Sequence, residues 1–324
     1  MTTTPRRALL ATPALLLPAA ARAQDWPTRP VTMMIPFVAG GPSDITGRLI
    51  AARAGVALGQ PMVAENRPGA NGAVAAQALA RAAPDGHTIM TGSIGVYAIN
   101  QALRTNLGYD ALRDFAPITL AVTTPNVLVA NPARMPATDV AGTLAWLRAN
   151  GAQAAYSTSG VGSSEHMTME LFKLRTRTEA THVPYQGGAA AATALIAGDV
   201  QLTFQNLGTV APHIEAGRLR AILVTSAARH PLLPQVPTAV ESGLADFVVT
   251  SWQAVMAPAA TPAPILARLE AVSREALRHP ESVQRLNGIG FDVVASSAAE
   301  YRRFQEAEVA RWREVVRAAN IRAE

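Results

Sequence analysis

The stretch IPFVAGGPSD, residues 35–44, joins an apolar run that ends like a strand to a run that begins like a helix. Its consecutive glycines, Gly40 and Gly41, let backbone N–H groups converge, and the start of a helix adds about half a positive charge. Pro42 fits the first turn of that helix. The segment therefore predicts a backbone cradle for an anion, with an ordinary tight strand-to-helix turn as the alternative interpretation.

The same junction of a strand with a helix recurs along the chain. This alternation predicts an α/β fold in which parallel sheets are covered by helices. Sheets of this class bind ligands beyond the carboxyl ends of their strands. The expected strands span 31–37, 61–66, 87–92, 126–132, 154–160, 181–188, 200–206, 219–226 and 246–258.

The end of the chain has a different pattern, with long amphipathic helices expected over 262–280 and 296–320. A chain of 324 residues is long for one domain and sufficient for two. We therefore expect two α/β lobes, between which the chain crosses twice: 24–124 together with 250–324, and 125–249.

Residues 1–23 have the pattern of an export signal. Arg6 and Arg7 precede an apolar run that ends in an A-x-A cleavage site, so we expect cleavage before Gln24. The apolar run is shorter than the roughly 20 residues that span a bilayer, which disfavours a membrane anchor. The paired arginines leave the export route open between general secretion (Sec) and the twin-arginine pathway.

The composition excludes several classes of site. The chain is 49% hydrophobic and 16% charged, so it can bury a large core. It has no cysteine, which excludes disulfides, thiol catalysis and thiolate metal sites. Its histidines show no metal-ligand spacing, and no cluster of basic and aromatic residues predicts nucleic-acid binding. We expect no metal, no cofactor and no nucleic-acid partner, and we expect a monomer.

Five of the strand-to-helix junctions are rich in glycine or in short polar side chains. Because all of them follow strands, we expect them on the side of the sheets where a cleft would lie. One such junction is weak evidence, whereas several in two lobes predict a cleft with backbone donors on both walls. They are 39–44, 91–95, 158–166, 184–188 and 204–206.

Two ionisable side chains in these junctions have alternative interpretations. Asp44 would repel a naked anion, so it either caps the helix or contacts a hydroxyl, an ammonium group or a water on the ligand. His166 either packs or caps within its helix, or contacts the ligand. Ser163 and His166 with a distant aspartate would imitate a hydrolase triad, but the chain contains no G-x-S-x-G, P-loop or dinucleotide-binding motif. We therefore expect no enzymatic activity.

Several phrases of the chain, in their order, resemble one family of solute receptors. Among them are RPVTMMIPFVAGGPSDITGRLIA, VAENRPGANGAVAA, STSGVGSSEHMTMELF, HVPYQGG and SWQAVMAPAATPAPI. They resemble the solute receptors of tripartite tricarboxylate transporters, also called Bug proteins, over essentially the whole mature chain. The resemblance implies a type II-like periplasmic-binding-protein fold, whose two α/β lobes close over a small organic carboxylate. It also implies a periplasmic location and, as partner, a membrane permease with one large and one small subunit.

In that family the carboxylate is held by backbone amides, hydroxyls and bridging waters. The family's ligand loops map onto the five junctions of this chain. The resemblance therefore implies the following ligand-binding residues: Phe37, Ala39, Gly40, Gly41, Asp44, Ser93, Ser159, Gly160, Gly162, Ser163, His166, Tyr185, Gly187 and Gln205.

Two positions depart from the family pattern. The family usually carries aspartate where this chain has Gln205, and a basic residue is common where it has Gln186. Both changes remove charge, so we expect a more neutral pocket that avoids ligands with an ammonium group. The sequence thus predicts a periplasmic receptor for a small carboxylate. A ligand-sensing module for a signalling partner and an exported hydrolase are the alternatives.

Overall fold

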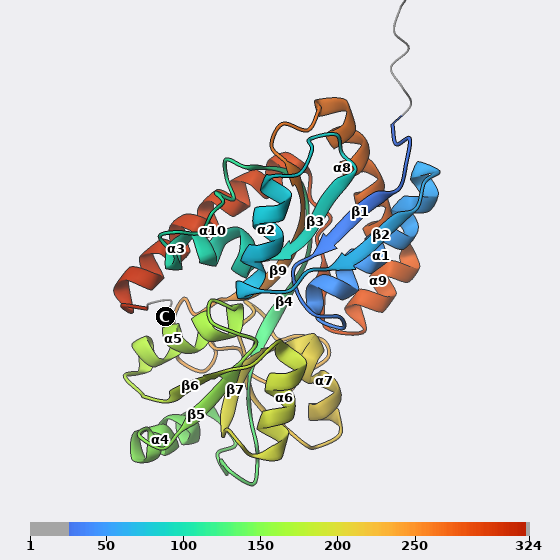
Figure 1. Ribbon diagram of the computed structural model, residues 1–324. Coiled ribbons are helices and arrows are strands. Elements are labelled where there is room, and N and C mark those ends of the chain that lie inside the picture. Colours follow the sequence, from blue (N-terminus) through green and yellow to red (C-terminus); the bar gives the residue numbers. More distant parts are fainter. Residues whose placement is uncertain (1–25, 322–324) are drawn as a thin grey trace, which may run out of the picture.

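Strand β4 (Phe115–Ala130) is the element that joins the two halves of the molecule (Figure 1). Its first part pairs with β9 (Thr250–Pro258) as far as Pro125. Its last part pairs with β7 (Leu202–Asn206) in the other half. One strand of 16 residues therefore belongs to both lobes.

The computed structural model describes residues 26–321, and the predicted export signal, 1–23, lies outside this range. Within it, no helix is both long enough and apolar enough to cross a membrane. In lobe 1 the strands lie in the order β2-β1-β3-β9-β4, and β10 pairs with β4. Besides β4 and β9, its elements are β1 (Val31–Ile35), α1 (Pro42–Leu58), β2 (Met62–Asn66), η1 (Ala70–Gly72), α2 (Ala73–Ala80), β3 (Thr88–Ser93), η2 (Gly95–Ile99), α3 (Asn100–Leu103), α8 (Ala263–Arg278), α9 (Pro280–Asn287), β10 (Asp292–Val293) and α10 (Ala298–Ala318).

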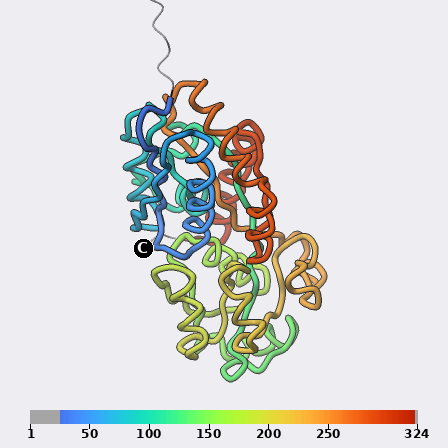
Figure 2. The backbone as a smooth tube through the Cα atoms, turned by 90° about the vertical axis from the view of Figure 1, so that its right-hand side faces the viewer, coloured from blue at the N-terminus to red at the C-terminus, as the bar shows by residue number. Residues whose placement is uncertain are grey.

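Lobe 2 continues the sheet beyond β4 in the order β7-β5-β6, and β8 also pairs with β4. Figure 2 shows the middle of the chain gathered in this lobe, while the N-terminal and C-terminal segments share the other. Besides β7, its elements are α4 (Val140–Asn150), β5 (Ala155–Thr158), α5 (Ser164–Thr176), β6 (Thr181–Pro184), α6 (Gly188–Ala197), α7 (Leu207–Glu215) and β8 (Arg220–Val224).

Three apolar clusters fill the space between the sheet and its helices. One of them runs through both lobes, from Trp252 and Trp312 in lobe 1 to Phe172 and Phe204 in lobe 2. A second packs α1 and α8 on lobe 1, and a third packs α6 and α7 on lobe 2. Each lobe is therefore a sheet with helices on both faces, as the βα alternation predicts.

Helix α1 shows how the sequence positions the site. Its buried residues include Gly47, Ile50 and Ala54, and this spacing of three or four residues turns one face of the helix toward the sheet. Pro42 occupies the first helical position, as expected, and Gly41 is the N-cap. The N-terminus of α1 therefore lies just beyond the carboxyl end of β1.

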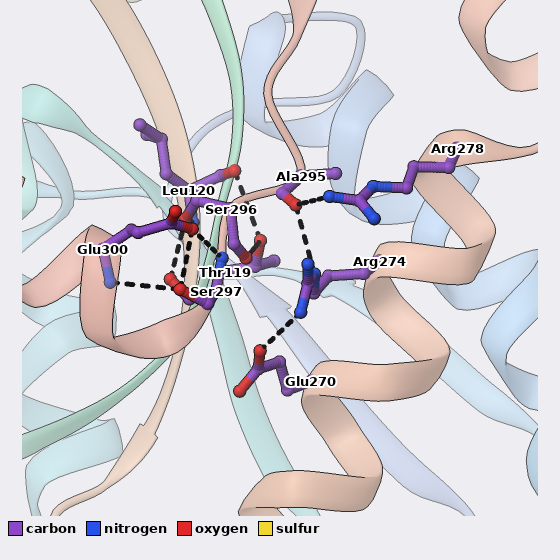
Figure 3. Close-up of polar contacts among 9 residues, drawn as sticks. All are labelled: Thr119, Leu120, Glu270, Arg274, Arg278, Ala295, Ser296, Ser297 and Glu300. Atoms are coloured by element: carbon purple, nitrogen blue, oxygen red, sulfur yellow. Dashed lines mark hydrogen bonds and ion pairs between the residues drawn. The ribbon is translucent and has the colours of Figure 1, made fainter.

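The segment before α10 is anchored to both β4 and α8 (Figure 3). Thr119 Oγ1 donates to the carbonyl oxygen of Ser296 at 2.8 Å. The carbonyl oxygen of Ala295 accepts from Arg274 Nε at 3.2 Å and from Arg278 Nη2 at 3.0 Å. These contacts fix where α10 begins, so the C-terminal helix covers strands that are far from it in sequence.

The sheet differs from the expectation in two ways. Pairs of strands linked by a helix are parallel, but β9 with β3, and β4 with each of its neighbours, are antiparallel. Strand β4 begins at Phe115, well before the expected start at 126. The local alternation of strands and helices predicts the helix-linked pairs of strands. It does not predict which strand from a distant part of the sequence pairs with them. The predicted lobe boundaries, after residues 124 and 249, stay a prediction. They lie close to the point along β4 where pairing with β9 ends and pairing with β7 begins.

Candidate ligand-binding site

A cavity of about 340 Å³ lies between the two lobes. All five of the predicted junctions contribute residues to its wall, three of them from lobe 2. The carboxyl ends of strands from both halves of the sheet thus meet at one place, which is where sheets of this class bind ligands.

The structure sorts the predicted binding residues into two groups, and contact of either group with a ligand stays a prediction. Eight line the cavity: Phe37, Ala39, Gly40, Gly41, Ser93, Ser159, Ser163 and Gly187. The other six are not part of its wall: Asp44, Gly160, Gly162, His166, Tyr185 and Gln205.

Helix α1 begins at the cavity without a side-chain cap. Pro42 has no N–H, and no acceptor in the described part of the chain takes the N–H of Gly41. The N–H of Gly40 is already used, because it donates to Asp44 Oδ2 at 3.0 Å. Gly40 also has φ 85°, a left-handed conformation that disfavours other residues. The cradle therefore offers the amide of Gly41 and the amides of the first turn of α1.

Asp44 is turned away from the cavity and is 5% exposed. Besides Gly40, it accepts from Arg48 Nε at 2.8 Å and from Asn66 Nδ2 at 2.9 Å. Burial on its own would raise the pKa of this carboxyl, but the hydrogen bonds from Gly40, Asn66 and Arg48 and the charge of Arg48 lower it. Asp44 is thus a charged group that is neutralised inside lobe 1, where it holds the glycine loop.

In lobe 2, helices α6 and α7 also begin at the cavity without a side-chain cap. Gly187 and Asn206 are their N-caps, and Gly188 and Thr209 in their first turns line the cavity. An uncapped first turn presents unpaired N–H groups and the positive end of the helix dipole. Together with α1, three such N-termini meet around one cavity.

Helix α5 differs from these three because it is capped. Ser163 Oγ accepts from the N–H of His166 at 3.2 Å. The ring of His166 stacks on His182, with ring centroids 4.1 Å apart, and its Nδ1 accepts from the N–H of Gly162 at 3.3 Å. Burial lowers the pKa of His166 to about 4 and that of His182 to about 3. The serine contacts the backbone of His166 and not its ring, an arrangement that argues against the nucleophile and base of a hydrolase.

The sequence interpretation missed several polar residues of the wall. Glu165 lines the cavity at 5% exposure, and Gln253 and His213 line it as well. Asn206 also lines the cavity, and it lies in the predicted junction 204–206. An acid in the first turn of an expected helix was a signal for Glu165, which lies inside the predicted junction 158–166. Gln253 gave no such signal, because it lies within strand β9, and the tertiary fold brings it to Ser43 Oγ at 2.5 Å.

The positive charge of the wall comes from the backbone and not from basic side chains. Across residues 26–321, no lysine or arginine lines the cavity, and no group of three or more potential metal ligands occurs. Burial, and then Arg218, lower the pKa of His213. Gln205 is fully buried with its carboxamide oxygen next to Gly188, and neither of its polar atoms has a partner in the described part of the chain.

The two lobes contact each other beside the cavity. Gly162 of lobe 2 has φ 80°, and a Cβ added to it would lie 3.0 Å from Asn71 Nδ2 and 3.1 Å from Leu103 Cδ1, both in lobe 1. Elsewhere, a Cβ on Gly187 would lie 3.3 Å from Cγ2 of Val38. Bare backbone of lobe 2 therefore lies against lobe 1 beside the cavity, and closure of the lobes over a ligand stays a prediction.

Comparison with protein families and curated proteins agrees with this geometry. A family model described as "Tripartite tricarboxylate transporter family receptor" matches residues 46–321. Protein BugT of Bordetella pertussis is 34% identical over 296 residues, which are 91% of this chain and 90% of that protein. A UPF0065 protein of Agrobacterium vitis, from the TAR-I ttuE-ttuC' intergenic region, is 37% identical over 88% of this chain and 82% of its own.

Solved structures show the same architecture. The R. palustris protein Rpa4515 with adipate has a TM-score of 0.88 and 38% identity, over 92% of this chain and 99% of that one. MatC (Rpa3494) from Rhodopseudomonas palustris with bound malate has a TM-score of 0.85 and 33% identity, over 90% and 100%. The periplasmic binding protein BugD has a TM-score of 0.86 and 29% identity, over 92% and 100%. The predicted two-lobe periplasmic-binding-protein fold and the predicted family resemblance are confirmed.

Proposed function

The chain belongs to the tripartite tricarboxylate transporter receptor family, and from this we propose that it captures a small organic carboxylate between its lobes and delivers it to a membrane permease of the tripartite type. The family is one of periplasmic solute receptors, so the export signal predicted for residues 1–23 would bring this chain to the periplasm. There it would act as a monomer, without a cofactor and without enzymatic activity.

One observation supports a carboxylate above other ligands. Three helix N-termini, those of α1, α6 and α7, meet uncapped at a cavity that no lysine or arginine of the described residues lines. Each N-terminus contributes about half a positive charge and several free N–H donors. A carboxylate supplies the acceptors that these donors need, and its charge matches the summed dipoles.

The same geometry supports lobe closure. A ligand that contacts α1 of lobe 1 and α6 or α7 of lobe 2 binds better when the lobes are closed, and so it shifts the population toward the closed form. That form would then dock on the permease. The ligands of the neighbours, adipate and malate, support a small acid of about four to six carbons.

The direct test is a thermal-shift and calorimetric screen of residues 24–324 against a panel of carboxylates that includes adipate and malate. The protein is first unfolded and refolded to remove any ligand acquired during production. At a hundredfold excess over its Kd, a true ligand raises the free energy of unfolding by about 2.7 kcal/mol. If no carboxylate shifts the refolded protein, the proposal is wrong.

Gly41→Ala tests the placement of the cradle. Gly41 has φ −84°, and an added Cβ would meet no atom closer than the carbonyl oxygen of Val38 at 3.9 Å, so the variant should fold normally. The methyl group would crowd the free amide, and we expect at least a tenfold loss of affinity at an unchanged melting temperature. Gly40→Ala is a poorer test, because its φ of 85° predicts a loss of stability as well. Normal binding by Gly41→Ala would show that the amide of Gly41 is not part of the anion-binding cradle.

A further inference from the structure

We infer that Glu165 and Asn206 form an acceptor wall in the cavity, so that the preferred ligand is a carboxylate with a hydrogen-bond donor, a hydroxyl or an ammonium group, at its far end. This inference rests on the proposed function and adds to it the chemistry of the second end of the ligand. A series of hydrogen bonds in lobe 2, each with a fixed direction, leads to this wall.

A backbone carbonyl group fixes the donor and the acceptor in this series of hydrogen bonds. Thr168 Oγ1 donates to the carbonyl oxygen of Ser164 at 2.7 Å, and a carbonyl oxygen can only accept. The hydroxyl proton of Thr168 is therefore used, so Thr168 Oγ1 accepts from Asn126 Nδ2 at 2.9 Å. The amide of Asn126 must then turn its oxygen toward Asn206.

Asn206 uses its amide donors within lobe 2 and leaves its amide oxygen at the cavity. Its Nδ2 donates to Asn126 Oδ1 at 2.6 Å and to Ser164 Oγ at 3.2 Å, which uses both of its hydrogens. Its Oδ1 remains as an acceptor on a residue that lines the cavity. Ser164 Oγ, which accepts from Asn206, donates in turn to Glu165 Oε2 at 3.1 Å.

The hydroxyl of Ser164 therefore cannot donate a hydrogen bond to a ligand carboxylate. Ser164 has used its proton on Glu165, and hydrogen bonds from Ser159 and Ser163 also favour the charged form of this carboxyl. Ser164 lines the cavity, but with its proton directed to Glu165 it offers no donor there. This part of the wall offers acceptors, in contrast to the N-termini of α1, α6 and α7.

Glu165 has no cation to balance it. In residues 26–321 it forms no ion pair, and no lysine or arginine lines the cavity. Burial raises the pKa of Glu165, although hydrogen bonds from the three serines oppose this. A second carboxylate of a ligand would be repelled here, whereas a hydroxyl group would supply a further donor and an ammonium group would also supply the missing positive charge.

This inference reverses one expectation from the sequence. Gln186 and Gln205 suggest a neutral pocket that avoids ammonium groups, but that argument leaves out Glu165. Because Glu165 lies on the wall and Gln205 lies behind it, the acid decides which groups are accepted at this end.

The experiment compares acids of equal length that differ in one terminal group. Refolded protein is titrated calorimetrically at pH 7 with adipate, 6-hydroxyhexanoate and 6-aminohexanoate, and with succinate, 4-hydroxybutanoate and 4-aminobutanoate. At one of the two lengths at least, we expect the hydroxy or amino acid to bind at least tenfold more tightly than the diacid. Glu165→Gln should lower the affinity for that amino acid at least tenfold and raise the affinity for the diacid.

Asp199→Asn is the matched control, because it removes the same charge from lobe 2 at an exposed residue outside the cavity wall. It should leave all six affinities unchanged, and a melting temperature for each variant separates misfolding from lost binding. If the diacids bind as tightly as the donor-bearing acids at both lengths, or if Glu165→Gln leaves the order of affinities intact, the acceptor wall is wrong while the carboxylate receptor stands. If none of the acids binds, nor any of the wider panel, the proposed function fails and this inference fails with it.

Discussion

Helices α1 and α5 begin on opposite walls of the cavity, and the sequences that lead into them are similar: GGPSD at 40–44 and GVGSSE at 160–165. Each has glycines, a serine and an acid in the first turn of the helix. In the structure the two helix N-termini differ in their capping and in the position of their acidic side chain. The first turn of α1 is uncapped and its acid is neutralised away from the cavity, whereas α5 is capped and its acid lies on the cavity wall.

The difference comes from the residues around each acid. Arg48, one turn after Asp44, pairs with it, and Asn66 reaches it from strand β2. The residue at the same spacing after Glu165 is Met169, which is buried in the core. The partners of a first-turn acid therefore decide whether it holds a loop in place or forms part of the binding site, and the motif alone does not.

The largest effect expected from this contrast is the response to acid. The four histidines with lowered pKa values, at positions 166, 182, 213 and 230, all lie in lobe 2. Below pH 6.5 these histidines are protonated in the unfolded chain but stay neutral in the folded protein. The free energy of unfolding therefore falls as the pH is lowered toward 4. A histidine that stays neutral in the folded protein and is protonated on unfolding contributes about 1.4 kcal/mol per pH unit. Asp44, with its lowered pKa, keeps its contribution until the pH falls below 3.8.

Denaturant unfolding at a series of pH values between 7 and 4 measures this slope. The double variant His166→Gln, His182→Gln should flatten it, because the stacked pair accounts for the largest shifts in lobe 2. Glu165 acts in the opposite direction, since a raised pKa adds stability as the pH falls, and Glu165→Gln should therefore steepen the loss. An equal slope in the double variant and the wild type would contradict the assignment.

The second prediction compares the two acids directly by amide substitution. Asp44→Asn replaces an acceptor of three hydrogen bonds with a group that cannot satisfy all of them, and we expect it to lower the free energy of unfolding by about 2 kcal/mol. Glu165→Gln removes an unpaired buried charge, so it should cost little or add stability. Urea unfolding at pH 7 measures both, and a loss for Glu165→Gln as large as that for Asp44→Asn would show that the two acids play the same structural role.

The smallest expected effect concerns the closed contact between the lobes. Gly162→Ala forces a Cβ into the left-handed region, at about 1–2 kcal/mol, and also pushes against Asn71 and Leu103 of lobe 1. We expect closure to weaken and the affinity for every ligand to fall about tenfold. Gly217→Ala is the control, because Gly217 has a similar φ of 67° with no atom within 4 Å of an added Cβ. The control should lose stability but keep its affinity, and a matching loss of affinity in both variants would count against the closure contact.

Much of this molecule could be predicted from local pattern. The junctions, Pro42 in the first position of α1, and most strands of the helix-linked units follow from the apolar periodicity and from the positions of glycine and proline. The expectation that Asp44 caps α1 was wrong, because Gly41 is the N-cap and no side chain caps the helix. The pattern missed α9 (Pro280–Asn287) and the first part of β4. Both are stabilised by contacts with distant segments, which a local window does not contain.

The amino-acid sequence by itself determined the family, the alternation of strands and helices, and the set of backbone junctions from which the cavity is built. The tertiary structure decided which wall each side chain faces. Asp44 turns inward because Asn66 and Arg48 are beside it. Glu165 lies on the cavity wall, and the hydrogen bonds from Thr168 through Asn126 and Asn206 leave the hydroxyl of Ser164 pointing at it. The physical reason is that a hydrogen bond has a direction, and that direction is fixed by partners that are distant in sequence and meet only in the folded protein.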